Sequence, residues 1–192
     1  ILYNTGNNIL SIEQHVDGEN EKFYIRILSE STDGLFPQEE LTKLSETLNG
    51  TICLFNPNKK INVAILGSIE SSPIYDLLIK NKAHELNCNF PVIISNHQEL
   101  SSVSEKFNIG FIHINNNTEL MKTLKEKEIE LIILARYMQI IPKEIVKLYS
   151  NKIINIHHGF LPAFKGARPY HQAYNKGVKI IGATAHYVTD NL

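Results

Sequence analysis

Short apolar runs alternate with amphipathic stretches along residues 61–156. The runs, such as INVAILG at 61–67, are continuously apolar, which is typical of strands buried on both faces. The stretches between them, such as PIYDLLIKNKAHEL at 73–86, carry apolar residues at helical spacing. Strands joined through helices need crossover connections, and these place neighbouring strands parallel. The pattern therefore predicts a doubly wound α/β domain with a mostly parallel sheet.

The same alternation predicts where the other elements of this domain lie. Strands are expected at 91–95, 110–114, 131–135 and 152–156, and helices at 99–107, 118–129 and 142–149. In a Rossmann-like sheet of this kind, a ligand lies beyond the carboxyl ends of the strands, near the point where the strand order reverses. Asn155 and His157 lie at such an end, so we expect them to belong to a ligand site.

Residues 1–56 follow a different pattern. ILYNTG at the start is typical of a helix tail, with Gly6 suited to the left-handed conformation that ends a helix. Strands with alternating polarity are expected at 8–16 and 22–28 around the turn DGEN, followed by a helix at 37–48 and a strand at 51–55. The order predicts a small α+β sandwich that lacks its first strand. Residues 57–60 have the polar composition of a linker.

Charge and cysteine content narrow the classes of partner. The 192 residues include 19 basic and 20 acidic ones, so broad attraction to nucleic acid or to an anionic membrane surface is not expected. No apolar run approaches the roughly 18 residues of a membrane span. Cys53 and Cys88 lack the spacing of a disulfide framework, which predicts buried thiols and a reducing, cytoplasmic compartment. The expected partners are small molecules or copies of this chain.

The side chains of Asn155 and His157 carry two functional groups that can assist attack on an acyl carbon. A carboxamide donates hydrogen bonds to an oxygen that becomes negative, and an imidazole moves protons near neutral pH. Residues two apart on a strand face the same side, whereas Ile156 between them is expected to point into the core. Two other interpretations stay open. One is a turn-forming Asn beside a half-exposed His, and the other is a metal site drawn from His157, His158, His171 and His186, although these lack the spacing of a helical zinc motif.

The stretch NIHHGFLPAFKG at 155–166 resembles the signature of the folate-dependent formyltransferases, which act on a formyl group carried by tetrahydrofolate. The wider context, from LARYMQIIP at 134–142 to the end of the chain, resembles the hydrolytic branch, the formyltetrahydrofolate deformylases. Residues 1–56 resemble the ferredoxin-like, amino-acid-sensing ACT module of these deformylases. The resemblance therefore implies a partial ACT-like regulatory domain at 1–56 and a formyltransferase-like catalytic domain at 61–192.

The resemblance also implies a role for each matching residue. Asn155 would stabilise the oxyanion of a tetrahedral intermediate, His157 would act as general acid and base, and His186 would complete the catalytic group. Substrate-binding positions are implied at Met138, Gln139, Ile141, Val146, His158, Gly159, Thr189, Asp190, Asn191 and Leu192. The first four match a pterin-binding segment, and the last four match a loop that closes over the pterin. Ordinary core packing for the pterin positions, and a sheet-bonded histidine at 186, remain alternative interpretations.

The loop after the first strand of the catalytic domain favours water as the acceptor of the formyl group. In the transferases that formylate glycinamide ribonucleotide, backbone amides of a Gly-rich loop cradle the substrate phosphate. Here the loop contains the acidic Glu70 and also Pro73, which has no amide hydrogen. We therefore expect hydrolysis of 10-formyltetrahydrofolate, without metal or cofactor, supplying formate for purine synthesis and balancing the one-carbon pool. Two alternatives remain: a catalytically impaired folate-binding or amino-acid-sensing regulator, and a formyl transferase with another acceptor.

The ends of the chain bear on these alternatives. The family pattern places an Asp seven residues after His186, at the position that follows Leu192. Together with the missing first strand, this predicts a chain trimmed at both ends. Gly159 and Arg168 stand where deformylases usually carry Ser and Asn, and their effect on rate stays open. An amino-acid effector is implied by the resemblance alone, and self-association is expected through the exposed strands of residues 1–56.

Overall fold

The computed structural model describes residues 2–3, 6–31, 37–157, 159, 163 and 168–189. The chain divides into two compact units, Ile1–Asn56 and Pro57–Leu192. No helix in the described part of the chain is long and apolar enough to cross a membrane.

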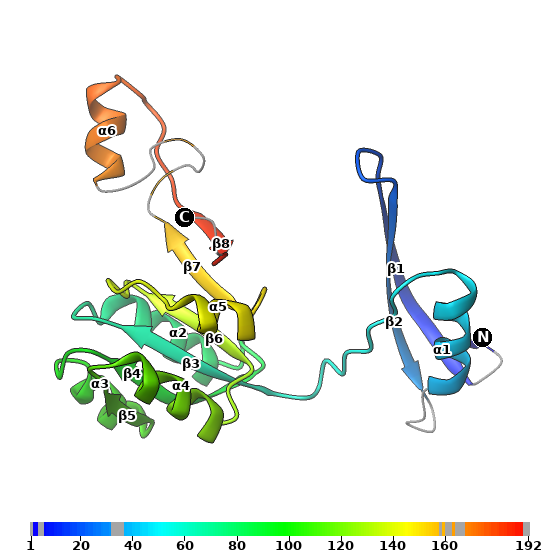
Figure 1. The fold of residues 1–192 in the computed structure, drawn as a ribbon, viewed down its shortest axis with the longest axis horizontal. Coiled ribbons are helices and arrows are strands. Elements are labelled where there is room, and N and C mark those ends of the chain that lie inside the picture. The colour runs from blue at the N-terminus through cyan, green and yellow to red at the C-terminus, as the bar shows by residue number, and fades with distance from the viewer. Residues whose placement is uncertain are drawn as a thin grey trace. The chain divides into compact units, whose positions relative to one another are not determined.

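The first unit is built on an antiparallel β-hairpin. Strands β1 (Asn7–Asp17) and β2 (Lys22–Ser31) pair along their length, which confirms the hairpin prediction. The Asp17 carboxylate accepts hydrogen bonds from the side chain of Asn20 at 2.8 Å and from its backbone N–H at 3.2 Å. These bonds lower the pKa of Asp17 and fix the turn between the strands. Helix α1 (Gln38–Thr47) lies along one side of the hairpin (Figure 1).

The strand predicted at 51–55 is absent from the first unit. Among the described residues its sheet contains β1 and β2 alone, so the segment has no neighbour to complete a hydrogen-bond ladder. Phe55 is 85% exposed, and Cys53 is exposed as well, so the prediction of a buried thiol is wrong at that position. Gly6 does adopt the expected left-handed conformation, with φ of 72°.

The second unit contains a six-stranded sheet in the order β5-β4-β3-β6-β7-β8. Its strands are β3 (Ile61–Gly67), β4 (Cys88–Ser95), β5 (Gly110–His113), β6 (Leu131–Ala135), β7 (Ile153–His157) and β8 (Thr184–Tyr187). The strands from β5 to β7 are all parallel, and β8 runs antiparallel to β7. The predicted α/β class with a mostly parallel sheet is therefore confirmed. Strands β3 and β6 have the predicted bounds because their runs are continuously apolar.

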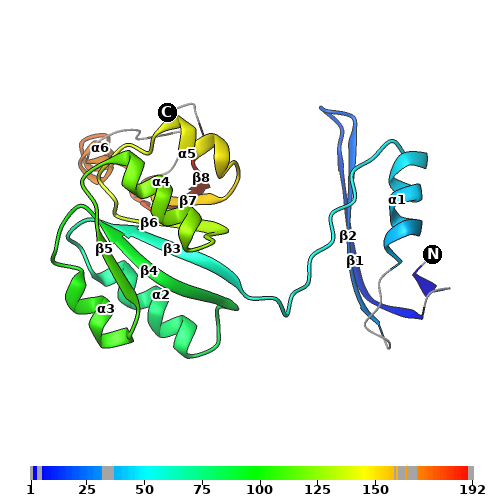
Figure 2. The same cartoon turned by 60° about the horizontal axis from the view of Figure 1, so that its bottom comes forward.

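Helices cover both faces of this sheet, as Figure 2 shows. Helices α2 (Ser72–Lys82) and α3 (Ser101–Phe107) bury one face in a core cluster that includes Ile65, Ile74 and Val103. Helices α4 (Asn117–Glu126) and α5 (Lys143–Leu148) bury the other face around Leu66, Leu124 and Ile145. The sheet is therefore doubly wound. A further helix, α6 (Pro169–Asn175), was not among the sequence-based predictions.

Two local features fix how the chain leaves the strands. The Asn116 side chain caps α4 by accepting the Glu119 N–H at 2.8 Å, which satisfies one of the free donors of a helix start. At Gly67, the last residue of β3, an added Cβ would lie 2.7 Å from Leu100 Cδ1 and 3.0 Å from Ile74 Cδ1. A larger residue at position 67 would therefore require the Leu100 and Ile74 side chains to shift, because α2 and the start of α3 pack closely against the strand end.

Candidate active site

The strand order reverses between β3 and β6. From β3 the chain continues to β4 and β5 on one side, and it then returns to place β6, β7 and β8 on the other side. The carboxyl ends of β3, β6 and β7 meet at one edge of the sheet, because these strands are parallel. A ligand crevice is expected at such a reversal. The β6–β7 register places Asn155 directly beside Leu134, next to this point.

Asn155 and His186 contact each other across β7 and β8. They are register partners, and Asn155 Nδ2 lies 3.4 Å from His186 Nε2. The other ring nitrogen, Nδ1, lies 3.0 Å from the Tyr187 carbonyl oxygen. Because a carbonyl can only accept, Nδ1 carries the proton, and in the neutral ring Nε2 accepts from the Asn155 amide. The arrangement fixes both the tautomer of His186 and the orientation of the Asn155 carboxamide.

The Asn155 amide has a donor to spare. A carboxamide NH₂ group carries two N–H bonds, and one of them points to His186. The second has no partner among the residues that the structure describes. A donor held in place beside the strand-order reversal can stabilise an oxygen that develops negative charge.

His157 is the last residue of β7, and its register partner is Thr184. The hydroxyl of Thr184 donates to the Gly159 carbonyl at 2.8 Å, which ties the chain after β7 back to β8. Ile156 is 61% exposed, so the expectation that it points into the core is wrong. Neither core cluster contains Ile156.

The four predicted pterin-binding residues divide into two kinds. Met138 and Gln139 are exposed in the loop after β6. Ile141 and Val146, by contrast, are 8% and 7% exposed and belong to the core beneath α5. Tyr137 in the same loop is partly buried against that core, and its burial raises the pKa of the phenol. In the loop after β6, the exposed side chains of Met138 and Gln139 therefore lie next to a buried core.

Ser68, which was not among the residues predicted from sequence, connects three loops at the carboxyl edge of the sheet. Its side chain is 5% exposed, and its hydroxyl donates to Asn96 Oδ1 at 3.3 Å and accepts the Met138 N–H at 3.1 Å. The Ser68 carbonyl in turn accepts from the Ser95 hydroxyl at 3.1 Å. The available signal was a polar residue placed immediately after the buried run that ends at Gly67.

The other predicted site residues are placed as follows. Gly159 is buried, and Thr189 follows β8 in an exposed position. His158, Asp190, Asn191 and Leu192 lie outside the described residues, as does the side chain of His157. Of the other histidines in the metal interpretation, His171 is exposed on α6, whereas His186 lies on β8. Within the described part of the chain, no group of three or more His, Cys, Asp or Glu side chains could hold a metal ion.

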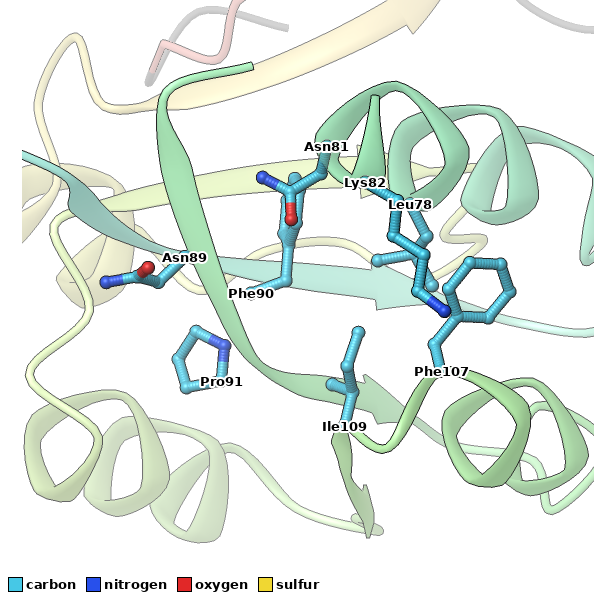
Figure 3. A pocket seen from close by; sticks show the side chains of 8 residues that line it. All are labelled: Leu78, Asn81, Lys82, Asn89, Phe90, Pro91, Phe107 and Ile109. Carbon is cyan, nitrogen blue, oxygen red and sulfur yellow. The ribbon is translucent and has the colours of Figure 1, made fainter. Parts of the chain in front are cut away.

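A cavity of about 270 Å³ lies at the opposite end of the sheet, near the start of β4. Figure 3 shows its lining of α2 and β4 side chains, with Lys82 beside the ring of Phe107. Asn81 borders it and donates its amide hydrogens to the carbonyls of Leu86 and Cys88, at 3.1 and 2.7 Å. The cavity is therefore separate from the Asn155–His186 pair, and the Asn81 amide on its border is engaged in holding the backbone.

Comparison with known proteins gives consistent results. Residues 61–192 match the family model described as formyl transferase. The formyltetrahydrofolate deformylase of Escherichia coli (strain K12) is 38% identical over 202 residues, spanning 100% of this chain and 71% of that protein.

Solved structures agree with the sequence comparison. A crystal structure of a formyltetrahydrofolate deformylase from Pseudomonas syringae pv. tomato has a TM-score of 0.93 at 35% identity, covering 100% of this chain and 68% of that one. A phosphoribosylglycinamide formyltransferase from Anaplasma phagocytophilum has a TM-score of 0.65 at 31% identity, covering 70% of this chain and 67% of that one. The family match over residues 61–192 and the similarity across the whole chain show that this chain belongs to the formyl transferase family.

Proposed function

We propose that the protein hydrolyses 10-formyltetrahydrofolate to formate and tetrahydrofolate. The observation that carries this proposal is the oriented Asn155 amide, with one donor held by His186 and one N–H left for a substrate oxygen. Its support from relatives is the similarity of the whole chain to proteins named formyltetrahydrofolate deformylase. The reaction would supply formate for purine synthesis and balance the one-carbon pool.

In the proposed reaction, water adds to the formyl carbon and the carbonyl oxygen becomes an oxyanion. The second N–H of Asn155 donates a hydrogen bond to that oxygen, and this hydrogen bond strengthens as the negative charge develops. His157 takes a proton from the water and delivers one to N10 as the bond between the formyl carbon and N10 breaks. The other product leaves as formic acid, which loses its remaining proton to solvent and becomes formate, and tetrahydrofolate keeps the proton on N10.

His186 acts in this scheme as a positioning residue. Its Nε2 accepts from the Asn155 amide, while the Tyr187 carbonyl holds the ring through Nδ1. The ring therefore sets the direction of the remaining Asn155 N–H. Met138, Gln139, Ile141, Val146, His158, Gly159, Thr189, Asp190, Asn191 and Leu192 are proposed to bind the folate. The scheme requires no metal and no cofactor.

Residues 1–56 are proposed to form a partial ACT-like regulatory domain of ferredoxin-like type. The hairpin and α1 support this assignment, and the effector would be a small amino acid. Large apolar side chains on both strands, including Ile12, Val16 and Phe23, are more than half exposed. They support self-association of the chain through this unit, because strands in such a ribbon have open edges. A cytoplasmic location is proposed from the substrate and the cysteine content.

The test is to mix the protein with 10-formyltetrahydrofolate and to follow formate and tetrahydrofolate together. Equal release of both products supports hydrolysis. Folate binding without formate release would overturn the proposal and leave a folate-binding regulator. Addition of candidate amines reveals a transferase, because formylated amine would then appear in place of formate.

A further inference from the structure

An ion pair joins the two loops that flank the strand-order reversal. Arg136, the first residue after β6, lies with Nη1 at 3.8 Å from Oε2 of Glu70 in the loop after β3. The backbone bond from Met138 N–H to the Ser68 hydroxyl, at 3.1 Å, connects the same two loops. The pair is therefore part of a crosslinked edge rather than an isolated surface contact.

The strand register places this pair next to the candidate catalytic amide. Gly67 pairs with Ala135, so the residues that follow them, Ser68 and Arg136, begin side by side. Leu134, two residues before Arg136, is the register partner of Asn155. Arg136 and Glu70 thus lie at the same carboxyl edge of the sheet as Asn155, in the two loops at the strand-order reversal between β3 and β6.

A guanidinium is the side chain best suited to bind phosphate, because its fork of N–H donors matches two phosphate oxygens. Here the Glu70 carboxylate neutralises that guanidinium. The two side chains are 56% and 55% exposed, so the pair adds little to stability but does set the local charge. An incoming phosphate would meet both a carboxylate and an arginine that is already paired.

We propose that Glu70 is a specificity-determining residue that keeps phosphate-bearing acceptors out of the crevice by pairing with Arg136. Water then remains as the acceptor of the formyl group. The inference rests on the proposed hydrolysis and deepens it. The contrast is with the relative of 31% identity whose name specifies a phosphoribosyl acceptor.

The experiment removes the carboxylate and measures phosphate binding directly. In Glu70→Gln, Arg136 loses its ion pair with the Glu70 carboxylate, and inorganic phosphate should bind about three- to ten-fold more tightly than to the unchanged protein. Calorimetric or NMR titration of the full chain measures this without any folate. The double change Glu70→Gln with Arg136→Gln should abolish the gain.

A matched control is Asp76→Asn on α2. This change removes one carboxylate charge in the same way, because Lys80 pairs with Asp76 at 3.0 Å, but it does so on α2 and not in the loops at the strand-order reversal. Equal phosphate affinity of Glu70→Gln and Asp76→Asn would overturn the inference, as would a gain that survives Arg136→Gln. Formate release by the unchanged protein is assayed separately. Its absence would overturn the proposed hydrolysis, whereas its presence without a phosphate gain would overturn the role of Glu70 alone.

Discussion

Asparagine side chains lie at both ends of the six-stranded sheet, and the two ends use them differently. At the amino end, Asn81 donates to the carbonyls of Leu86 and Cys88 at 3.1 and 2.7 Å, so both amide hydrogens are engaged. At the carboxyl end, Asn155 donates one hydrogen to His186, and its second has no partner among the described residues. The Asn81 carboxamide therefore uses both N–H groups to hold the backbone, whereas the Asn155 carboxamide has one N–H available for a ligand.

We therefore expect Asn81 to contribute to the stability of the fold and Asn155 to contribute to the reaction. Asn81 fixes the connection between α2 and β4, and its removal would take a side-chain donor away from two backbone carbonyls. Asn155 is held by a neighbouring side chain, so its removal would leave the backbone ladder of β7 and β8 intact. Four predictions compare the two ends of the sheet, in order of decreasing expected effect.

Asn155→Ala should have the largest effect. Loss of one oxyanion donor typically lowers kcat by about 10²- to 10³-fold. Within the described part of the chain, the Asn155 side chain contacts His186 and no backbone bond depends on it. We expect formate release to fall by that factor, while the thermal unfolding midpoint changes little. Formate assays and thermal melts measure the two quantities on the same preparation.

Asn155→Asp is the matched variant, because it keeps the size of the side chain and removes the donor. It should be as slow as Asn155→Ala. A rate near that of the unchanged protein in either variant would mean that the amide is not an oxyanion donor.

Asn81→Ala should show the opposite pattern. Two carbonyls lose their donor, so the free energy of unfolding should fall by about 1–3 kcal/mol, with kcat unchanged. Urea denaturation measures the loss. Asn89→Ala, a change of an exposed asparagine at the same end of the sheet, serves as the control and should stay within about 0.5 kcal/mol. If the Asn89 and Asn81 variants lose equal stability, the bracing role of Asn81 is wrong.

Ser68→Ala should affect substrate binding more than the chemical step. The Met138 N–H loses its acceptor, so the loop after β6 becomes less well positioned. We expect the KM for the folate to rise by about ten-fold, in line with roughly 1–1.5 kcal/mol for one hydrogen bond, and kcat to fall less. Ser68→Thr keeps the hydroxyl and should recover KM. Equal losses in kcat and no recovery by Thr would contradict a positioning role.

The partly buried Tyr137 and the buried Tyr149 should give the smallest effect. Burial raises the pKa of Tyr137 at the carboxyl end and of Tyr149 at the amino end above the ordinary value of 10.0. The unfolded chain then releases its phenol protons first, so stability falls as pH rises above about 10. Tyr137→Phe and Tyr149→Phe should each flatten this alkaline loss by less than about 1 kcal/mol.

Tyr174→Phe is the control for both changes, because Tyr174 is 83% exposed. Denaturation curves between pH 8 and 11 compare the three variants. A flattening by Tyr174→Phe equal to the others would show that burial is not the cause.

The fold of the second unit was largely predictable from sequence. Continuous apolar runs mark β3 and β6, because a strand covered on both faces carries no alternation. The hairpin of the first unit was predictable from alternation and from the turn at Asp17. The segment at 51–55 has the same apolar character, yet it is not a strand, because a strand also depends on a neighbour that local sequence does not specify.

The residues of the candidate site could be predicted only where a single continuous segment of sequence carries them. Asn155 was found because it ends an apolar run, and His186 was implied by the family resemblance. The contacts of Ser68 and Arg136 depend on the register between β3 and β6, whose residues lie about 70 positions apart. Periodicity carries no information on such distant pairing, so neither residue could be placed from the sequence alone.

The contact between Asn155 and His186 also has a consequence for synthesis of the protein. It joins residues 31 positions apart, and β8 is the last strand that the structure describes. A growing chain leaves the ribosome with β3 to β7 and their covering helices before His186 emerges. The core of the sheet can therefore fold during translation while the Asn155 amide still lacks its partner, so a stalled chain would be folded before it is active.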